Sequence, residues 1–77
     1  KVQIAASKNK IQLKSYNFKG LRNLSRLKSG KFYKYYYSTS SNLVQIIKKR
    51  DYAISKGFDN AYVVGFENGI QINLKEQ

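Results

Sequence analysis

One run of residues constrains the fold of this chain more than any other. Residues 31–38 read KFYKYYYS, and five of these eight residues are aromatic. Aromatic side chains favour the pleated surface of a β-sheet, so the run predicts a strand. Because side chains alternate between the two faces of a strand, Lys34 and Tyr36 should share one face and the odd-numbered tyrosines the other.

Two further strands are predicted before the middle of the chain. Residues 2–7 alternate between apolar and small or polar side chains. This pattern predicts a strand whose even-numbered residues face one way and whose odd-numbered residues face the other. Ser29 and Gly30 separate residues 24–28 from the aromatic run, and a glycine in so short a connection predicts a hairpin.

Two helices of unequal length are predicted. Residues 17–22 offer a capping residue and one or two helical turns, weakened by an internal glycine. Residues 41–56 place apolar side chains on one helical stripe, and Asn42 followed by Gln45 resembles a capping box. Gly57 stands where a left-handed C-terminal cap belongs.

The C-terminal part predicts a second hairpin. Residues 61–66 read as a strand, and Asn68-Gly69 is the preferred signal for a type I′ turn, so residues 70–74 should return as an edge strand. The order is β-α-β-β-α-β plus one extra strand. We therefore predict an α+β fold, a ferredoxin- or RNP-like sandwich in which two helices cover one face of an antiparallel sheet. The other face would stay open, and function should be sought there.

The charge of the chain is strongly unbalanced. Fifteen Lys and Arg residues face four acids, a formal net charge of +11. Such an excess attracts nucleic acid, an anionic membrane surface or an acidic cell-wall polymer, unless lysine serves only solubility. No run of 18 apolar residues exists, so no membrane span is predicted. The chain starts at Lys1 without Met, and we interpret residues 1–77 as one domain of a longer protein.

The residue types argue against catalysis by this chain. Without Cys or His, zinc and iron–sulfur sites and Ser/His/Asp catalysis lack their essential groups. Glycosidase chemistry needs two carboxylates roughly 5–10 Å apart, one of them buried. Asp51 lies among lysines, and the other acids lie at turns or the terminus, namely Asp59, Glu67 and Glu76. We predict no enzyme, no metal and no cofactor.

Three stretches of the chain resemble a SPOR domain, the sporulation-related repeat that binds bacterial cell wall. They are VQIAAS at 2–7, FYKYYYSTSS at 32–41 and KGFDNAYVV at 56–64, so the resemblance covers nearly the whole chain. NFKGL at 17–21 is similar to the subtype at the C-terminus of N-acetylmuramoyl-L-alanine amidases of Bacteroidetes-type bacteria. The chain departs from the family at Ser38, where Gly is usual, and in its shorter first helix.

The resemblance implies a non-catalytic module that binds peptidoglycan glycan strands lacking stem peptides. It would target a parent cell-wall enzyme, such as an amidase, or a division protein within the bacterial cell envelope, in the periplasm or at the cell surface. The family pattern places Tyr35 and Tyr37 in the core, and puts Lys34 and Tyr36 on the open face beside Gln3. We expect a monomer, although the exposed edge at residues 70–74 could pair with a neighbour.

The candidate glycan-binding residues are Gln3, Ser7, Lys8, Lys34, Tyr36 and Tyr62. An amide such as Gln3 can donate to and accept from sugar hydroxyl and acetamido groups, or can simply be solvated. The Tyr36 ring could stack on a sugar or pack across strands. Lys34 has no packing role amid aromatic residues. Periodicity does not choose whether Tyr62 or Val63 faces outward.

Ser7 and Lys8 end the first strand, where they could equally form an ordinary loop.

Two alternative functions remain open. A single-stranded RNA-binding module would share the element order, and the positive charge suits phosphate. The run 31–37 echoes a base-stacking strand but lacks its glycine spacing, and residues 2–7 offer no stacking ring. A third hypothesis is an interaction or folding module with no polymer ligand.

Overall fold

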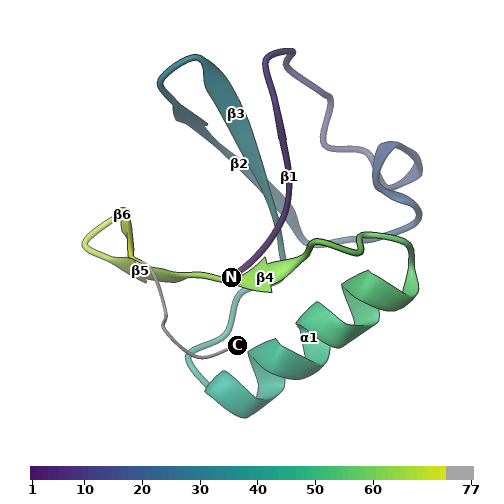
Figure 1. Cartoon of the computed structure of the whole chain (residues 1–77), viewed down its shortest axis with the longest axis vertical. Helices are drawn as coiled ribbons and strands as arrows, with labels where there is room; N and C mark the ends of the chain where they lie inside the picture. The colour runs from purple at the N-terminus through teal and green to yellow at the C-terminus, as the bar shows by residue number, and fades with distance from the viewer. Residues whose placement is uncertain (73–77) are drawn as a thin grey trace.

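The computed structural model describes residues 1–72, which form an antiparallel sheet, one α-helix and a separate hairpin (Figure 1). The predicted α+β class with an antiparallel sheet is confirmed. In chain order the elements are β1 (Val2–Ser7), the 3₁₀ turn η1 (Ser15–Phe18), β2 (Leu24–Ser29), β3 (Phe32–Tyr37), α1 (Leu43–Ser55), β4 (Tyr62–Val63), β5 (Gly65–Glu67) and β6 (Ile70–Ile72).

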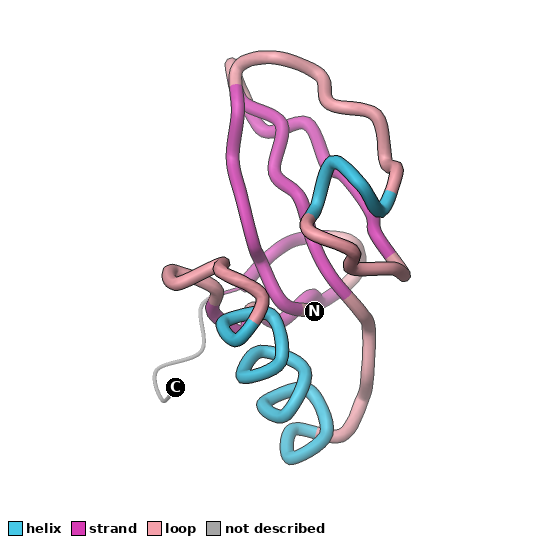
Figure 2. Tube along the Cα trace, turned by 90° about the vertical axis from the view of Figure 1, so that its right-hand side faces the viewer, coloured by secondary structure: helices cyan, strands magenta, loops and turns pink. Residues whose placement is uncertain are grey.

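The main sheet has the strand order β2-β3-β1-β4, and each neighbouring pair is antiparallel. Helix α1 packs against β1 and β4 on one side of this sheet. The connection that contains η1 lies on the same side as α1, whereas the β5–β6 hairpin lies on the other (Figures 1 and 2). The sheet therefore has a core face, covered by α1 and the η1 connection, and an outer face.

The predicted first helix at 17–22 is wrong, and so is the two-helix sandwich. The chain makes a single 3₁₀ turn, because Lys19 and Gly20 both adopt left-handed φ angles, 54° and 88°, which end a helix. The connection nevertheless covers its part of the sheet. Phe18 and Leu21 are both buried in the core, so an irregular segment replaces the second covering helix.

Helix α1 follows its prediction closely. It spans Leu43–Ser55 within the predicted 41–56, and the Asn42 side chain accepts a hydrogen bond of 3.1 Å from the Gln45 backbone N–H. Gly57 takes a left-handed φ of 109° just after the helix, as a C-terminal cap requires. The predicted apolar stripe is only partly buried, since Ile46 and Ala53 lie in the core whereas Leu43 remains exposed.

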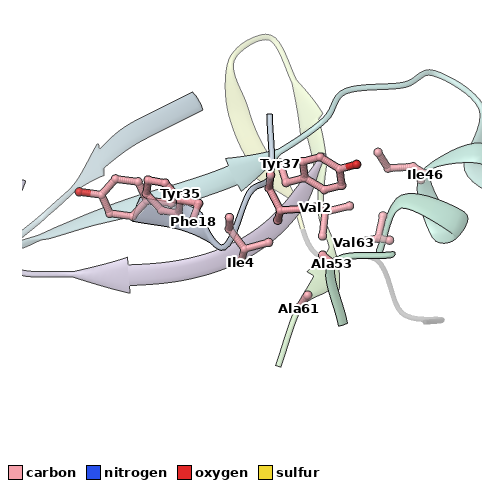
Figure 3. Close-up of a cluster of buried hydrophobic side chains, with 10 residues drawn as sticks. Val2, Ile4, Phe18, Tyr35, Tyr37, Ile46, Ala53, Ala61 and Val63 are labelled. Carbon is pink, nitrogen blue, oxygen red and sulfur yellow. The ribbon is translucent and has the colours of Figure 1, made fainter. Parts of the chain in front are cut away.

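The core is built around two aromatic residues of β3 (Figure 3). Tyr35 and Tyr37 are buried, as predicted. The Tyr35 ring centroid lies 5.2 Å from that of Phe18. The Tyr35 hydroxyl accepts a 2.6 Å hydrogen bond from the Ile11 N–H and donates one of 3.2 Å to the Asn9 carbonyl. Tyr35 thereby holds the irregular first connection against the sheet.

A β-bulge changes which residues of β1 face the core. Gln3 lies opposite Tyr36, but the next partner pair is Ala5 with Tyr35, so β1 carries one extra residue at this point. The strict alternation predicted for residues 2–7 is therefore wrong beyond Ile4. Ala5 packs against the core, whereas Ala6 is exposed on the outer face.

The C-terminal strands also depart from prediction. The single strand expected at 61–66 is broken at Val64, and the chain leaves the main sheet to form β5. Asn68 and Gly69 take φ angles of 52° and 79°, so the predicted type I′ turn is confirmed. β6 pairs with β5 and does not extend the main sheet, which corrects the predicted edge strand at 70–74. Residues 73 and 74 of that prediction lie outside the described residues.

Ser38 occupies a backbone conformation that favours glycine, with a φ of 63°. A left-handed conformation costs a non-glycine residue roughly 1 kcal/mol, partly offset by the greater unfolded-state freedom of glycine. We expect Ser38→Gly to keep or raise the free energy of unfolding, by up to about 1 kcal/mol, in urea denaturation. The β-branched variant Ser38→Val should be clearly destabilised; equal losses in both variants would contradict this account.

Candidate functional site

Three of the predicted site residues form one row on the outer face. Gln3 lies opposite Tyr36 on β3 and opposite Tyr62 on β4. The row therefore crosses three strands. Val63 is 3% exposed and Tyr62 is 39% exposed, so Tyr62 is the outward residue of β4.

A second row runs beside the first. Ala6 lies opposite Lys34, and Lys34 lies opposite Leu27 on β2. Lys34 thus sits on the outer face, as expected from the alternation of β3, between a small and a large apolar side chain. Leu27 was not predicted as a site residue, because the sequence of β2 alone does not show which of its faces is turned outward.

The β5–β6 hairpin covers one end of the outer face, so the prediction of a fully open face is wrong. Tyr36 is only 1% exposed, and the Phe66 ring packs edge-on against it with centroids 5.3 Å apart. The Tyr36 hydroxyl donates a 2.6 Å hydrogen bond to Oε1 of Gln71. Nε2 of Gln71 then donates a 3.3 Å bond to Oε1 of Gln3. The Tyr36 hydroxyl and Oε1 of Gln3 therefore hold the hairpin and are already partnered.

A shallow pocket of about 260 Å³ remains at the uncovered edge of this row. It lies along β1 and β4 and is lined by Gln3, Ile4, Ala5, Ala6, Asn60 and Tyr62. The small side chain of Ala6 leaves space that a bulky residue would fill. The half-exposed Tyr62 ring borders that space and offers an apolar surface with a polar tip.

The other end of the outer face carries a second exposed aromatic ring. Phe32 is 44% exposed, and the Nζ of Lys8 lies 6.0 Å from its ring centroid. Phe32 has the same parity as Lys34 on β3, so the alternation already contained this signal. Ser7 lies elsewhere, because it pairs with Tyr33, and its hydroxyl accepts a 3.1 Å hydrogen bond from the Asn9 N–H. The structure thus brings Lys8 to the outer face but not Ser7.

The first half of the chain is the source of the positive field. Between positions 8 and 34 there is no acid, and there are nine cations, Lys8, Lys10, Lys14, Lys19, Arg22, Arg26, Lys28, Lys31 and Lys34. Within residues 1–72 the only ion pair joins Arg50 to its neighbour Asp51, at 3.0 Å. Most of the charge is therefore uncompensated inside the described part of the chain, and it favours encounter with anionic partners.

The buried hydroxyl of Tyr36 should make the free energy of unfolding fall at alkaline pH. Burial is the main cause that raises the pKa of the Tyr36 hydroxyl, and the neighbouring Tyr62 phenol adds to it. Below about pH 10 this hydroxyl is protonated in both the folded and the unfolded chain. At higher pH the unfolded chain releases the proton first, so the free energy of unfolding falls as pH rises.

We expect the wild type to lose more stability than Tyr36→Phe between about pH 9 and 11.5, because only the wild type carries the buried phenol at this position. Urea denaturation of both proteins at each pH measures the difference. The comparison cancels the titration of lysines, which both proteins share. Parallel loss of stability in the two proteins would contradict the role assigned to the Tyr36 hydroxyl.

Comparison of this chain with protein-family models, curated proteins and solved structures found no match. The described residues contain no cluster of three His, Cys, Asp or Glu side chains that could hold a metal ion. Among residues 1–72, no helix has the length and apolar character needed to cross a bilayer. The outer face and the positive charge are therefore the features of the chain that bear on its function.

Proposed function

We propose that the outer face binds an extended sugar chain, namely peptidoglycan glycan strands that lack stem peptides, and that this chain is a non-catalytic SPOR-like module. The observation that carries the proposal is the Tyr62 ring beside the shallow pocket over Ala6. A flat, partly apolar ring next to small side chains suits the apolar side of a sugar, and the tyrosine hydroxyl suits its polar rim. Asn60, at the pocket edge, can both donate to and accept from sugar hydroxyls.

The length of the face fits a polymer better than a single sugar. Tyr62 lies on edge strand β4, Lys34 on β3, and Phe32 with Lys8 lies towards the β2–β3 turn. These groups lie on β3, on β4 and just beyond the end of β1, and they do not converge on a closed cavity. A chain of linked sugars could contact several of them at once, and many weak contacts together give useful affinity.

The RNA alternative is less well supported by the same face. RNA recognition on a sheet of this kind stacks two or three bases on aromatic rings of the central strands. Here the outward positions of the central strands include Gln3, Ala6 and Lys34, and the one central-row ring, Tyr36, is buried under the hairpin. The exposed rings, Tyr62 and Phe32, lie at the two margins of the outer face. Positive charge alone would then give only salt-dependent, non-specific binding.

In this proposal the module brings its parent protein to processed cell wall. The parent would be a cell-wall enzyme, such as an N-acetylmuramoyl-L-alanine amidase, or a division protein of the bacterial envelope. The positive field of residues 8–34 would speed encounter with the anionic wall. The shape of the outer face would provide the selectivity.

An amide-resolved NMR titration tests the proposal. Glycan fragments freed of stem peptides should shift the resonances of Ala6, Lys34 and Tyr62, with little dependence on salt. Single-stranded RNA of similar length should bind weakly and lose its affinity steeply as salt rises. Tight RNA binding centred on the same three residues would favour the nucleic-acid alternative. Absence of any glycan-induced shift on the outer face would overturn the proposal.

A further inference from the structure

A second groove lies on the opposite side of the molecule from the outer face. It runs between α1 and the end of the first connection, has a volume of about 790 Å³, and includes Leu21, Tyr37 and Gln45 in its lining. This volume is within the range of pockets that hold small molecules, roughly 300–1,000 Å³. The predicted functional face of the chain, which is the outer face with its margins, does not include this groove.

Three cations line this groove, and no acid does. Arg22 approaches from the first connection, and Lys48 and Lys49 approach from α1. None of the three takes part in an ion pair within residues 1–72, since Asp51 is paired with Arg50. Three like charges at one groove repel one another, and an anion placed between them would relieve that repulsion. An Arg with two Lys side chains is well suited to phosphate, because the guanidinium offers a planar fork and each ammonium a point charge.

Apart from the polar Asn23 and Gln45, the rest of the lining is apolar or aromatic. Leu21 and Tyr37 are buried and form apolar surface of the groove. Tyr52 lies one helical turn beyond Lys48 and is partly exposed, with its ring centroid 6.3 Å from that of Tyr37. A bare inorganic ion would leave this surface unused. A ligand that joins an anionic group to a compact body with carbon faces would use both parts.

We propose that this groove binds a phosphate ester carried on a sugar. Arg22, Lys48 and Lys49 bind the phosphate, and the sugar lies against the exposed part of Tyr52. This inference is independent of glycan binding at the outer face, because the two sites share no lining residue. Together they would allow one module to hold a neutral glycan on one side and a phosphorylated sugar polymer on the other.

NMR titrations of the 77-residue chain with a glucose phosphate, with inorganic phosphate and with glucose test the assignment. The glucose phosphate should bind most tightly and shift the resonances of Arg22, Lys49 and Tyr52. Replacing Lys48 and Lys49 together with Gln should weaken it about tenfold, as expected for two partly exposed charge-assisted contacts. A matched double variant, Lys28→Gln with Lys31→Gln, removes the same charge at the β2–β3 turn and should leave the affinity within about twofold.

Several outcomes would overturn the inference. Equal loss of affinity in the two double variants would mean that only the general field attracts the ligand. Equal affinity for inorganic phosphate and the glucose phosphate would remove the role of the sugar. Tighter binding of a uridine monophosphate than of the glucose phosphate at the same residues would mean that the apolar lining recognises a nucleobase and not the sugar. None of these results would alter the shifts expected at Tyr62 and Lys34 from neutral glycan, so failure here is separable from failure of the proposed function.

Discussion

Tyr35→Ala should destabilise this chain by about 3–5 kcal/mol, the usual cost of deleting a large buried aromatic side chain. Tyr35 is completely buried, packs on Phe18, and bonds through its hydroxyl to the backbone at Ile11 and Asn9. The substitution would open a cavity and also release the first connection. A domain of 77 residues has roughly 4–12 kcal/mol of stability in total, so this loss would remove a large share of it.

Two other variants separate the contributions of the ring and the hydroxyl. Tyr35→Phe keeps the ring but leaves the Ile11 N–H without its acceptor, and should cost about 1–3 kcal/mol. Tyr16→Ala removes a tyrosine that is 76% exposed on η1 and should change stability by less than about 0.5 kcal/mol. Urea denaturation of the three variants gives each value. Similar stability of Tyr35→Ala and Tyr16→Ala would contradict the core described here.

Tyr62→Ala should weaken glycan binding about tenfold, which corresponds to about 1.4 kcal/mol. Tyr62 borders the outer-face pocket with a partly exposed ring, and truncation of such aromatic contacts is typically the costliest change in a binding surface. Lys34→Ala should weaken binding by about threefold, because a partly exposed charge contributes less than a ring contact. Fluorescence titration with a labelled glycan fragment measures both effects.

Tyr16→Ala is the matched control for the binding measurement as well. It removes the same side chain from η1, outside the outer face, and should leave glycan affinity unchanged. Tyr62 is not part of the buried core, so Tyr62→Ala should remain folded, which urea denaturation verifies. Equal affinity of Tyr62→Ala and the wild type would remove Tyr62 from the site.

Local sequence signals predicted the elements whose causes are themselves local. The Asn42 cap and the Asn68-Gly69 turn depend on residues adjacent in the chain, and both are present as expected. The aromatic run at 32–37 also forms its strand, because no other element suits so many rings. Helical periodicity could not predict the 3₁₀ turn at Ser15–Phe18, because its place on the sheet depends on the contact of Phe18 with Tyr35, which is distant in the sequence.

The site was harder to predict than the fold. Alternation along β3 correctly placed Lys34 and Tyr36 on one face, but it carried no information on what lies above that face. The hairpin buries Tyr36 through Phe66 and Gln71, residues some 30 positions later in the chain. The bulge in β1 likewise comes from pairing with β3, and a period-two pattern cannot reveal it. Contacts between distant segments therefore decide which predicted residues a ligand can reach.

Binding to isolated bacterial sacculi tests the central claim most directly. Sacculi treated with an amidase carry glycan strands without stem peptides, and untreated sacculi keep the peptides. We predict that treated sacculi retain more of the wild-type chain than untreated sacculi do, and that Tyr62→Ala abolishes most of the difference. Equal or greater retention on untreated sacculi would contradict the claim that the outer face binds bare glycan.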